Sequence, residues 1–193
     1  MVKLPFVIIL GCLLTIPAVS QAADIFMFTG RVVAVSDGDT ITVLATESGK
    51  PEVVRLMSVD CPEKSQAYGM KAKEWTASHC FNREVTVVRH GYDRNRRSIG
   101  DVILPAGEHL NAALVKAGLA WWYRKYAPDD KALSDLEDEA RREKIGLWND
   151  AQPVAPWDYR HKKKTDAIDK RRVPVFTTSP RHSTEIVEQQ RHQ

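Results

Sequence analysis

The sequence predicts one α+β domain, a five-stranded Greek-key β-barrel with three helices. Five short segments are rich in β-branched residues and are bounded by turn-forming residues, which is typical of strands. One segment with helical spacing falls between the third and fourth strands, and two more follow the fifth. The length of 193 residues allows one domain with tails, and 43% hydrophobic and 27% charged residues is ordinary for a globular protein.

The elements follow one another with short connections. In chain order we expect strands at 29–35, 40–45 and 52–59, a helix at 70–80, strands at 84–90 and 98–104, and helices at 110–117 and 131–144. Gly118 suits the position after a helix end, and Asp129 or Asp130 can cap the last helix. The order βββαββαα matches the OB-fold, a partly open barrel that often binds nucleic acids. A fold alone establishes no function.

Residues 1–22 have the pattern of a secretory signal peptide. Lys3 precedes an apolar run over 5–19, and Ser20-Gln21-Ala22 offers a small-residue cleavage site. An uncleaved membrane anchor is the alternative, although the run is short for a membrane span. We therefore expect an exported protein, periplasmic or secreted, with its folded domain over 23–150.

The rest of the chain is less informative. Signal cleavage leaves Cys61 and Cys80, and an exported compartment permits a disulfide, but the sequence leaves open whether the two meet. Residues 151–193 are basic and polar without a persistent period, which favours a flexible tail. That tail is either a solvated terminus or an electrostatic tether to nucleic acid or an envelope surface. A net charge of +3 does not by itself indicate a nucleic-acid partner.

Carboxylates and arginines gather in three segments. These are Ser36-Asp37-Gly38-Asp39-Thr40, Arg55-Leu56-Met57-Ser58-Val59-Asp60-Cys61-Pro62-Glu63 and Tyr92-Asp93-Arg94-Asn95-Arg96-Arg97-Ser98. Carboxylates bind hard cations such as Ca²⁺, and arginines bind phosphate oxygens. Taken alone, Asp37-Gly38-Asp39 is more typical of a hairpin turn.

Arg55 is the residue that a purely structural role explains least. It lies in an apolar strand, where a charge is costly unless it has a partner. Alternation places Arg55 and Asp60 on opposite faces of a strand, so we expect a bend after Val59 to bring them together. The chain has no zinc-binding spacing of His or Cys, no Gly-x-Ser-x-Gly motif and no phosphate-binding glycine loop.

The three segments, in this order and at these intervals, resemble the thermonuclease family (staphylococcal or micrococcal nuclease) over residues 28–150. The resemblance implies a Ca²⁺-dependent nuclease that cleaves DNA and RNA and leaves 3′-phosphate ends. It implies metal binding by the carboxylates of Asp39 and Asp60 and the carbonyl of Cys61. Catalysis would fall to Glu63, the base that orients a water, and to Arg55 and Arg97, which stabilise the developing charge. Arg94 and Tyr126 would contact substrate, and Asp37 and Thr40 would support the ligands.

The chain departs from the family pattern at several positions. Cys61 stands where threonine is usual, which is harmless if only its carbonyl binds the metal. The family segment Asp-Arg/Lys-Tyr-Gly-Arg becomes Asp93-Arg94-Asn95-Arg96-Arg97. Counting to the fifth strand selects Arg97 and leaves Arg96 as a rival, while Asn95 can adopt a left-handed turn conformation.

Aromatic and basic residues are mixed in the segment Trp121-Trp122-Tyr123-Arg124-Lys125-Tyr126. Such a segment can stack on bases and attract the nucleic-acid backbone. Tyr126 matches a nucleotide-contacting tyrosine of the family, and Arg124 takes the place of another. We expect at least one tryptophan to belong to the core instead.

Two other functions compete with a nuclease. One is a non-catalytic nucleic-acid-binding module of the same family, and the other is a Ca²⁺-stabilised envelope protein whose tail binds surfaces. Degenerate members would be expected to lose the glutamate, the ligands or the arginines, and this chain keeps all of them. We therefore expect an enzyme, acting as a monomer on DNA and RNA, with no protein partner indicated by the sequence.

Overall fold

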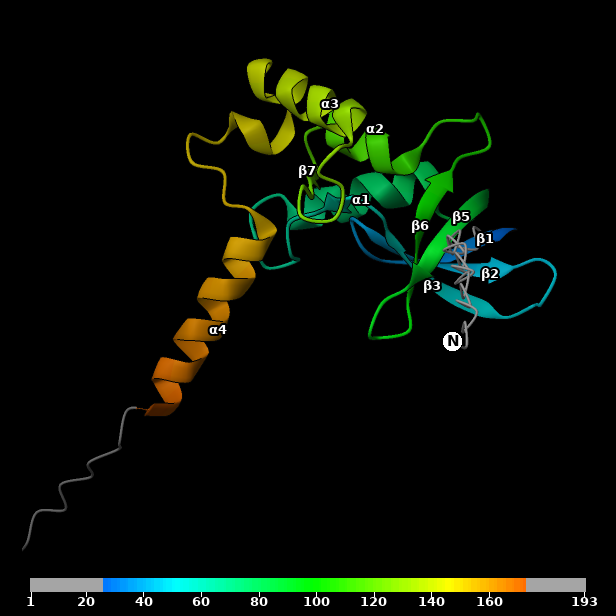
Figure 1. Ribbon diagram of the computed structural model, residues 1–193, viewed down its shortest axis with the longest axis horizontal. Coiled ribbons are helices and arrows are strands. Elements are labelled where there is room, and N and C mark those ends of the chain that lie inside the picture. Colours follow the sequence, from blue (N-terminus) through cyan, green and yellow to red (C-terminus); the bar gives the residue numbers. More distant parts are fainter. Residues whose placement is uncertain (1–25, 173–193) are drawn as a thin grey trace, which may run out of the picture.

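Five strands close into a barrel (Figure 1). The computed structural model describes residues 26–172. The barrel strands are β1 (Phe26–Asp37), β2 (Thr40–Ala45), β3 (Pro51–Leu56), β5 (Glu84–Tyr92) and β6 (Ser98–Ile103), in the spatial order β1-β2-β3-β6-β5. Each neighbouring pair is antiparallel except β3 and β6, which run parallel. This barrel confirms the predicted OB-fold.

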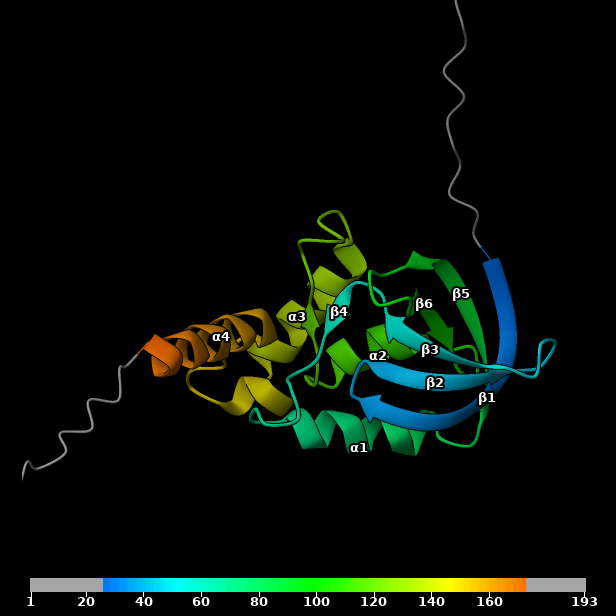
Figure 2. The same cartoon turned by 90° about the horizontal axis from the view of Figure 1, so that it is seen from below.

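The helices lie to one side of the barrel, and the last of them extends away from it (Figure 2). They are α1 (Gly69–Cys80), α2 (Leu110–Lys116), α3 (Lys131–Arg142), the 3₁₀ turn η1 (Gly146–Asn149) and α4 (Pro156–Arg172). Two short strands, β4 (Val59–Asp60) and β7 (Trp121–Trp122), pair antiparallel outside the barrel. Within residues 26–172, no helix has the length and apolar character that a membrane crossing requires.

The barrel interior is filled by alternating strand positions. Val32, Ile41, Val54 and Val87 come from four different strands and are completely buried, together with Leu114 of α2. Alternation of this kind is what the period of a strand produces when one face meets a core.

A second, smaller hydrophobic cluster lies outside the barrel. It is formed by Trp121, Ala140, Leu147, Trp148 and Ala155. Trp121 and Trp122 are both buried, which confirms the predicted core role of at least one tryptophan. The cluster packs the chain that leads into α4 against α3 and β7.

Most predicted elements are present with modest changes of length. β1 begins at Phe26 and ends at Asp37, beyond both predicted ends, and β2 has the predicted bounds. The side chain of Asp130 accepts a hydrogen bond from the Leu133 N–H at 3.0 Å, so the predicted cap of α3 is confirmed. Gly118 follows α2 with φ 62°, the left-handed conformation expected after a helix end.

The C-terminal segment contradicts one prediction. The sequence predicts no regular element within 151–193, yet α4 forms at Pro156–Arg172, as a fourth helix. Periodicity cannot predict it because polar side chains lie on every side and no apolar stripe runs along it. Pro156 was a usable signal, since proline favours the first position of a helix. The expected signal peptide at 1–22 and the end of the tail at 173–193 lie outside the described residues.

The bend between Arg55 and Asp60 lies before Val59, not after it as predicted. β3 ends at Leu56, and Ser58 takes a left-handed conformation with φ 64°. Asn111 of α2 fixes this turn, because its Nδ2 donates to the carbonyl of Met57 at 2.9 Å. A change of direction between two strands replaces the simple alternation that the sequence suggests.

The turn between β1 and β2 is packed tightly against α1. The hydroxyl of Thr76 donates to the carbonyl of Gly38 at 2.6 Å. A Cβ atom at Gly38 would lie 2.7 Å from the Cβ of Ala72 and 2.7 Å from the Sγ of Cys61. The close contact therefore requires glycine at this position.

We expect Gly38→Ala to lower the free energy of unfolding by about 1–3 kcal/mol, because the added methyl group overpacks a buried contact. Urea denaturation measures the change. Gly49→Asn is the control, since a Cβ there meets nothing within 4 Å and asparagine tolerates its φ of 63°. An alanine variant as stable as the control would contradict the packing described for this turn.

Candidate active site

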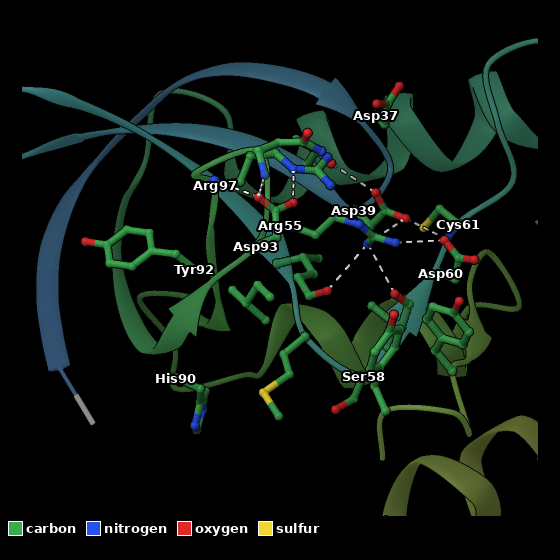
Figure 3. A pocket seen from close by; sticks show the side chains of 18 of the residues that line it. Asp37, Asp39, Arg55, Ser58, Asp60, Cys61, His90, Tyr92, Asp93 and Arg97 are labelled. Atoms are coloured by element: carbon green, nitrogen blue, oxygen red, sulfur yellow. Dashed lines mark hydrogen bonds and ion pairs between the residues drawn. The ribbon is translucent and has the colours of Figure 1, made fainter. Parts of the chain in front are cut away.

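One pocket of about 730 Å³ is lined by all ten residues to which the family resemblance assigns a role. They are Asp37, Asp39, Thr40, Arg55, Asp60, Cys61, Glu63, Arg94, Arg97 and Tyr126. They come from four separate stretches of the chain, which the barrel and its loops bring to one place. Figure 3 shows part of this pocket, with Asp39, Arg55 and Asp60 at its centre. The pocket is also lined by Arg160, which the sequence did not indicate, and by Tyr123, which the sequence placed in a base-stacking segment without assigning it a role.

Arg55 lies between the carboxylates of Asp39 and Asp60 (Figure 3). Its Nη1 is 2.8 Å from Asp39 Oδ2, and its Nη2 is 2.7 Å from Asp60 Oδ1. Nη1 also donates to the carbonyls of Leu56 at 3.4 Å and Val59 at 3.2 Å. Burial lowers the pKa of Arg55, but the two carboxylates outweigh burial and raise that pKa above its ordinary value. The charge in the apolar strand is thus fully partnered.

Asp39 has two hydrogen-bond donors besides its ion pair with Arg55. Its Oδ2 accepts the Cys61 N–H at 2.7 Å, and its Oδ1 accepts the Thr40 hydroxyl at 3.1 Å. Burial nevertheless raises the pKa of Asp39 above its ordinary value, although Arg55 and the Cys61 N–H act to lower it. The ionised carboxylate therefore still lacks part of the positive charge that would stabilise it. Asp37 is more exposed and lies 3.6 Å from Lys64, outside this network.

Asp60 and Glu63 share a partner from α4. Arg160 Nη2 lies 2.7 Å from Asp60 Oδ2, and Arg160 Nη1 lies 2.8 Å from Glu63 Oε1. Burial lowers the pKa of Arg160, but its bonds to Asp60 and Glu63 outweigh burial and raise it. The side chain of Asp60 is 1% exposed, whereas that of Glu63 is 42% exposed and open to the pocket. In the sequence, Arg160 is one basic residue among many, and nothing in its surroundings distinguishes it.

The two cysteines are free and buried, so no disulfide joins them. Burial raises the pKa of the Cys61 thiol well above its usual value, and it raises the pKa of Cys80 to about 12. Both thiols therefore stay protonated at neutral pH, and a protonated thiol is a poor metal ligand. The Sγ of Cys61 packs against Gly38. The backbone carbonyl is what remains of Cys61 as a candidate ligand.

Asp93 organises the loop between β5 and β6. Its Oδ1 accepts the N–H groups of Asn95 at 2.8 Å and Arg97 at 2.9 Å, and its Oδ2 accepts Arg97 Nε at 2.7 Å. Arg96 has a φ of 62°, so the left-handed residue is Arg96 rather than Asn95. Family members often have glycine at that position, as a left-handed conformation favours. Arg94 and Arg97 line the pocket, and Arg96 does not.

Two tyrosines form an aromatic wall. Tyr123 and Tyr126 meet edge to face with ring centroids 4.9 Å apart, and both line the pocket. The sequence comparison with the family does not select Tyr123, because it assigns the second tyrosine position to Arg124. Arg124 instead lies 2.8 Å from the buried carboxylate of Glu137 and away from this pocket.

Comparison with known proteins gives consistent matches. The model of the family described as staphylococcal nuclease homologues matches residues 53–150. A protein of Escherichia coli O157:H7 named "Uncharacterized endonuclease" is 45% identical over 134 residues, which are 69% of this chain and 86% of that protein. A protein of the same name from Haemophilus influenzae is 38% identical over 157 residues, covering 81% and 86%. A "Micrococcal nuclease" of Shigella flexneri is 39% identical over 146 residues, covering 71% and 83%.

The family model covers the segment that supplies Arg55, Asp60, Glu63 and Arg97 to the pocket. The relatives extend the similarity over more than two thirds of the chain. The fold, the grouped carboxylates and arginines, and these matches agree: the chain belongs to the staphylococcal nuclease homologue family.

Proposed function

We propose that this protein is an exported, Ca²⁺-dependent endonuclease that hydrolyses phosphodiester bonds of DNA and RNA and leaves 3′-phosphate ends. One observation carries the proposal: Arg55 holds the carboxylates of Asp39 and Asp60 together in a pocket that Glu63 and Arg97 also line. Hydrolysis of a phosphodiester needs a base for the attacking water. It also needs positive charge beside the phosphate oxygens, where negative charge develops. The pocket contains side chains for both tasks.

The donor set fits a hard cation. Nucleases of this family generally depend on a metal ion. Asp39, Asp60 and the carbonyl of Cys61 would hold Ca²⁺ here, since all are oxygen donors. Within residues 26–172, no group of three or more His, Cys, Asp or Glu side chains is arranged to hold a metal ion. Ca²⁺ also accepts backbone carbonyls and waters as ligands. When bound, the cation would supply Lewis-acid stabilisation of a phosphate oxygen.

Glu63 is the base in this proposal. Its carboxylate is open to the pocket and lies in a loop that Gln66 braces, because Gln66 Oε1 accepts the Glu63 N–H at 3.2 Å. A carboxylate within hydrogen-bond reach of the attacking water can orient it and accept its proton. The water oxygen then bonds to phosphorus as the P–O5′ bond breaks, and the 5′ oxygen leaves as a hydroxyl after taking a proton from solvent.

Arg55 and Arg97 would stabilise the charge that develops on the phosphate oxygens. Arg55 is fixed by three hydrogen bonds and by its ion pair with Asp39, and it brings a preorganised charge to the pocket wall. Arg97 pairs with Asp93 through Nε. Within residues 26–172 its Nη groups form no hydrogen bond or ion pair, so they are available for a bidentate contact with phosphate. Arg94 and the ring of Tyr126 would contact the neighbouring nucleotides.

The test of the proposed function is hydrolysis of single-stranded DNA and RNA by the purified protein, first with Ca²⁺ and then with EGTA. We expect cleavage that requires Ca²⁺ and products that end in 3′-phosphate. Tight nucleic-acid binding without cleavage in either condition would instead support the non-catalytic binding module. Cleavage that continues in EGTA would contradict the assignment of Asp39 and Asp60 to a calcium site.

Glu63→Gln removes the proposed proton acceptor and keeps the size of the side chain. We expect turnover to fall by about 100- to 10,000-fold, the usual contribution of a general base, while the melting temperature stays close to that of the parent. Steady-state cleavage of a defined oligonucleotide measures the change. Glu47→Gln, on an exposed turn, is the control. Unchanged turnover in Glu63→Gln would exclude this residue as the base.

Arg96 and Arg97 are adjacent, and glutamine variants of each separate their roles. Arg97→Gln should lower turnover by about 100-fold or more, since a donor to the developing charge is lost. Arg96→Gln should have little effect, because Arg96 does not line the pocket. The same oligonucleotide assay compares the two variants. A larger loss in Arg96→Gln would transfer the phosphate-binding role to that residue.

A further inference from the structure

The pocket contains a guanidinium that the proposed reaction does not use. Arg160, in the first turns of α4, contacts Asp60 with both terminal nitrogens, at 3.2 Å to Oδ1 and 2.7 Å to Oδ2. Its Nη1 also donates to Glu63 Oε1 at 2.8 Å. Arg160 therefore binds the oxygens of one proposed metal ligand and of the proposed base at the same time.

Asp60 has no oxygen that is free of a guanidinium. Oδ1 is bonded by Arg55 at 2.7 Å and by Arg160, and Oδ2 is bonded by Arg160. The side chain is almost completely buried. A divalent cation that binds this carboxylate approaches oxygens that already accept three hydrogen bonds from two guanidiniums, and it repels both of these positive charges.

Arg160 is the guanidinium that can move. Arg55 is 17% exposed, belongs to a barrel strand and donates to two backbone carbonyls besides its carboxylates. Arg160 is 42% exposed and donates only to Asp60 and Glu63 within residues 26–172. Its helix projects away from the barrel, as Figures 1 and 2 show.

The first turns of α4 are attached to the pocket itself. The ring of Trp157 stacks on Tyr123 with centroids 5.2 Å apart and an interplanar angle of 7°. The hydroxyl of Tyr159 donates to the carbonyl of Ser65 at 3.1 Å, next to the Glu63 loop. After Arg160 the helix is exposed as far as its side chains are described. The position of α4 therefore depends on the residues that surround the proposed metal site.

The balance of charges favours a cation that replaces Arg160 over a cation that binds beside it. The carboxylates of Asp39, Asp60 and Glu63 face the guanidiniums of Arg55 and Arg160, which leaves one net negative charge. A divalent cation added to this set would leave net positive charge beside a repelling guanidinium. With Arg160 withdrawn, the same set and the cation would be neutral.

We propose that Arg160 competes with the divalent cation for Asp60 and Glu63, so that metal binding and the docking of α4 oppose each other. The proposal rests on the metal assignment of the proposed function. In the absence of the cation, Arg160 pairs with both carboxylates and holds the first turns of α4 at the pocket. Binding of the cation displaces the guanidinium and frees Glu63 for its role as base. Coupling of this kind is reciprocal: a docked α4 weakens metal binding by the same factor as the metal weakens docking.

The first experiment measures Ca²⁺ affinity by calorimetry on the whole purified protein, without substrate. We expect Arg160→Gln to bind Ca²⁺ about tenfold more tightly or better, within the range of ordinary site-to-site coupling. Arg160→Lys should show a smaller gain, since lysine keeps the charge but cannot hold a carboxylate in a planar fork. Lys162→Gln is the control, because it removes a positive charge from an exposed position of the same helix.

The second experiment needs no variant. Amide hydrogen exchange over residues 158–164 should become faster when Ca²⁺ is added to the parent protein, because α4 loses its anchor on Asp60 and Glu63. Equal or weaker Ca²⁺ binding in Arg160→Gln would overturn the proposal, and so would exchange in α4 that Ca²⁺ slows or leaves unchanged. If neither parent nor variant bound Ca²⁺, the calcium assignment would fail as well. Tighter binding in the variant without any hydrolysis would leave this proposal supported and refute only the nuclease activity.

Discussion

The site is built around one buried guanidinium. Arg55 joins Asp39, in the turn between β1 and β2, to Asp60 in β4, with contacts of 2.8 and 2.7 Å. Without it, two carboxylates would lie buried side by side, an arrangement that costs several kcal/mol and raises their proton affinity. The turn at Ser58, the glycine at position 38 and the amide of Asn111 all serve this contact, because they fix the backbone that carries the three charges. Stability and proposed chemistry therefore depend on the same ion-pair network.

Much of the fold could be predicted from the sequence, because the signals for its elements lie within the elements themselves. The barrel strands carry their own alternation, and Asp130 carries its own cap, so both could be predicted without knowledge of distant residues. The carboxylates and arginines of the site could be selected because three short segments match a family pattern. The bend before Val59 could not, since Asn111, far along the chain, fixes it. The left-handed conformation of Arg96 had a signal that was not used, because the family pattern has glycine at that position. Tyr123 is not selected from the sequence, because the family pattern places Arg124 at its second tyrosine position.

The C-terminal helix shows where local patterns cease to be informative. α4 has no apolar stripe, and its placement comes from a few contacts at its start: the rings of Trp121 and Tyr123 around Trp157, and the ion pairs of Arg160. None of these contacts has a signature in the sequence alone. The segment beyond the family match at residue 150 is therefore part of the pocket, and the chemistry of Asp60 and Glu63 cannot be considered without it.

A crystal structure determined with Ca²⁺ and a non-hydrolysable oligonucleotide tests the central claim most directly. The account predicts a cation in contact with the carboxylates of Asp39 and Asp60 and the carbonyl of Cys61. Arg55 should keep its place between the two carboxylates, and Arg160 should have left Asp60. A cation bound elsewhere, or an Arg55 displaced from Asp39 and Asp60, would contradict the view that this guanidinium organises the site.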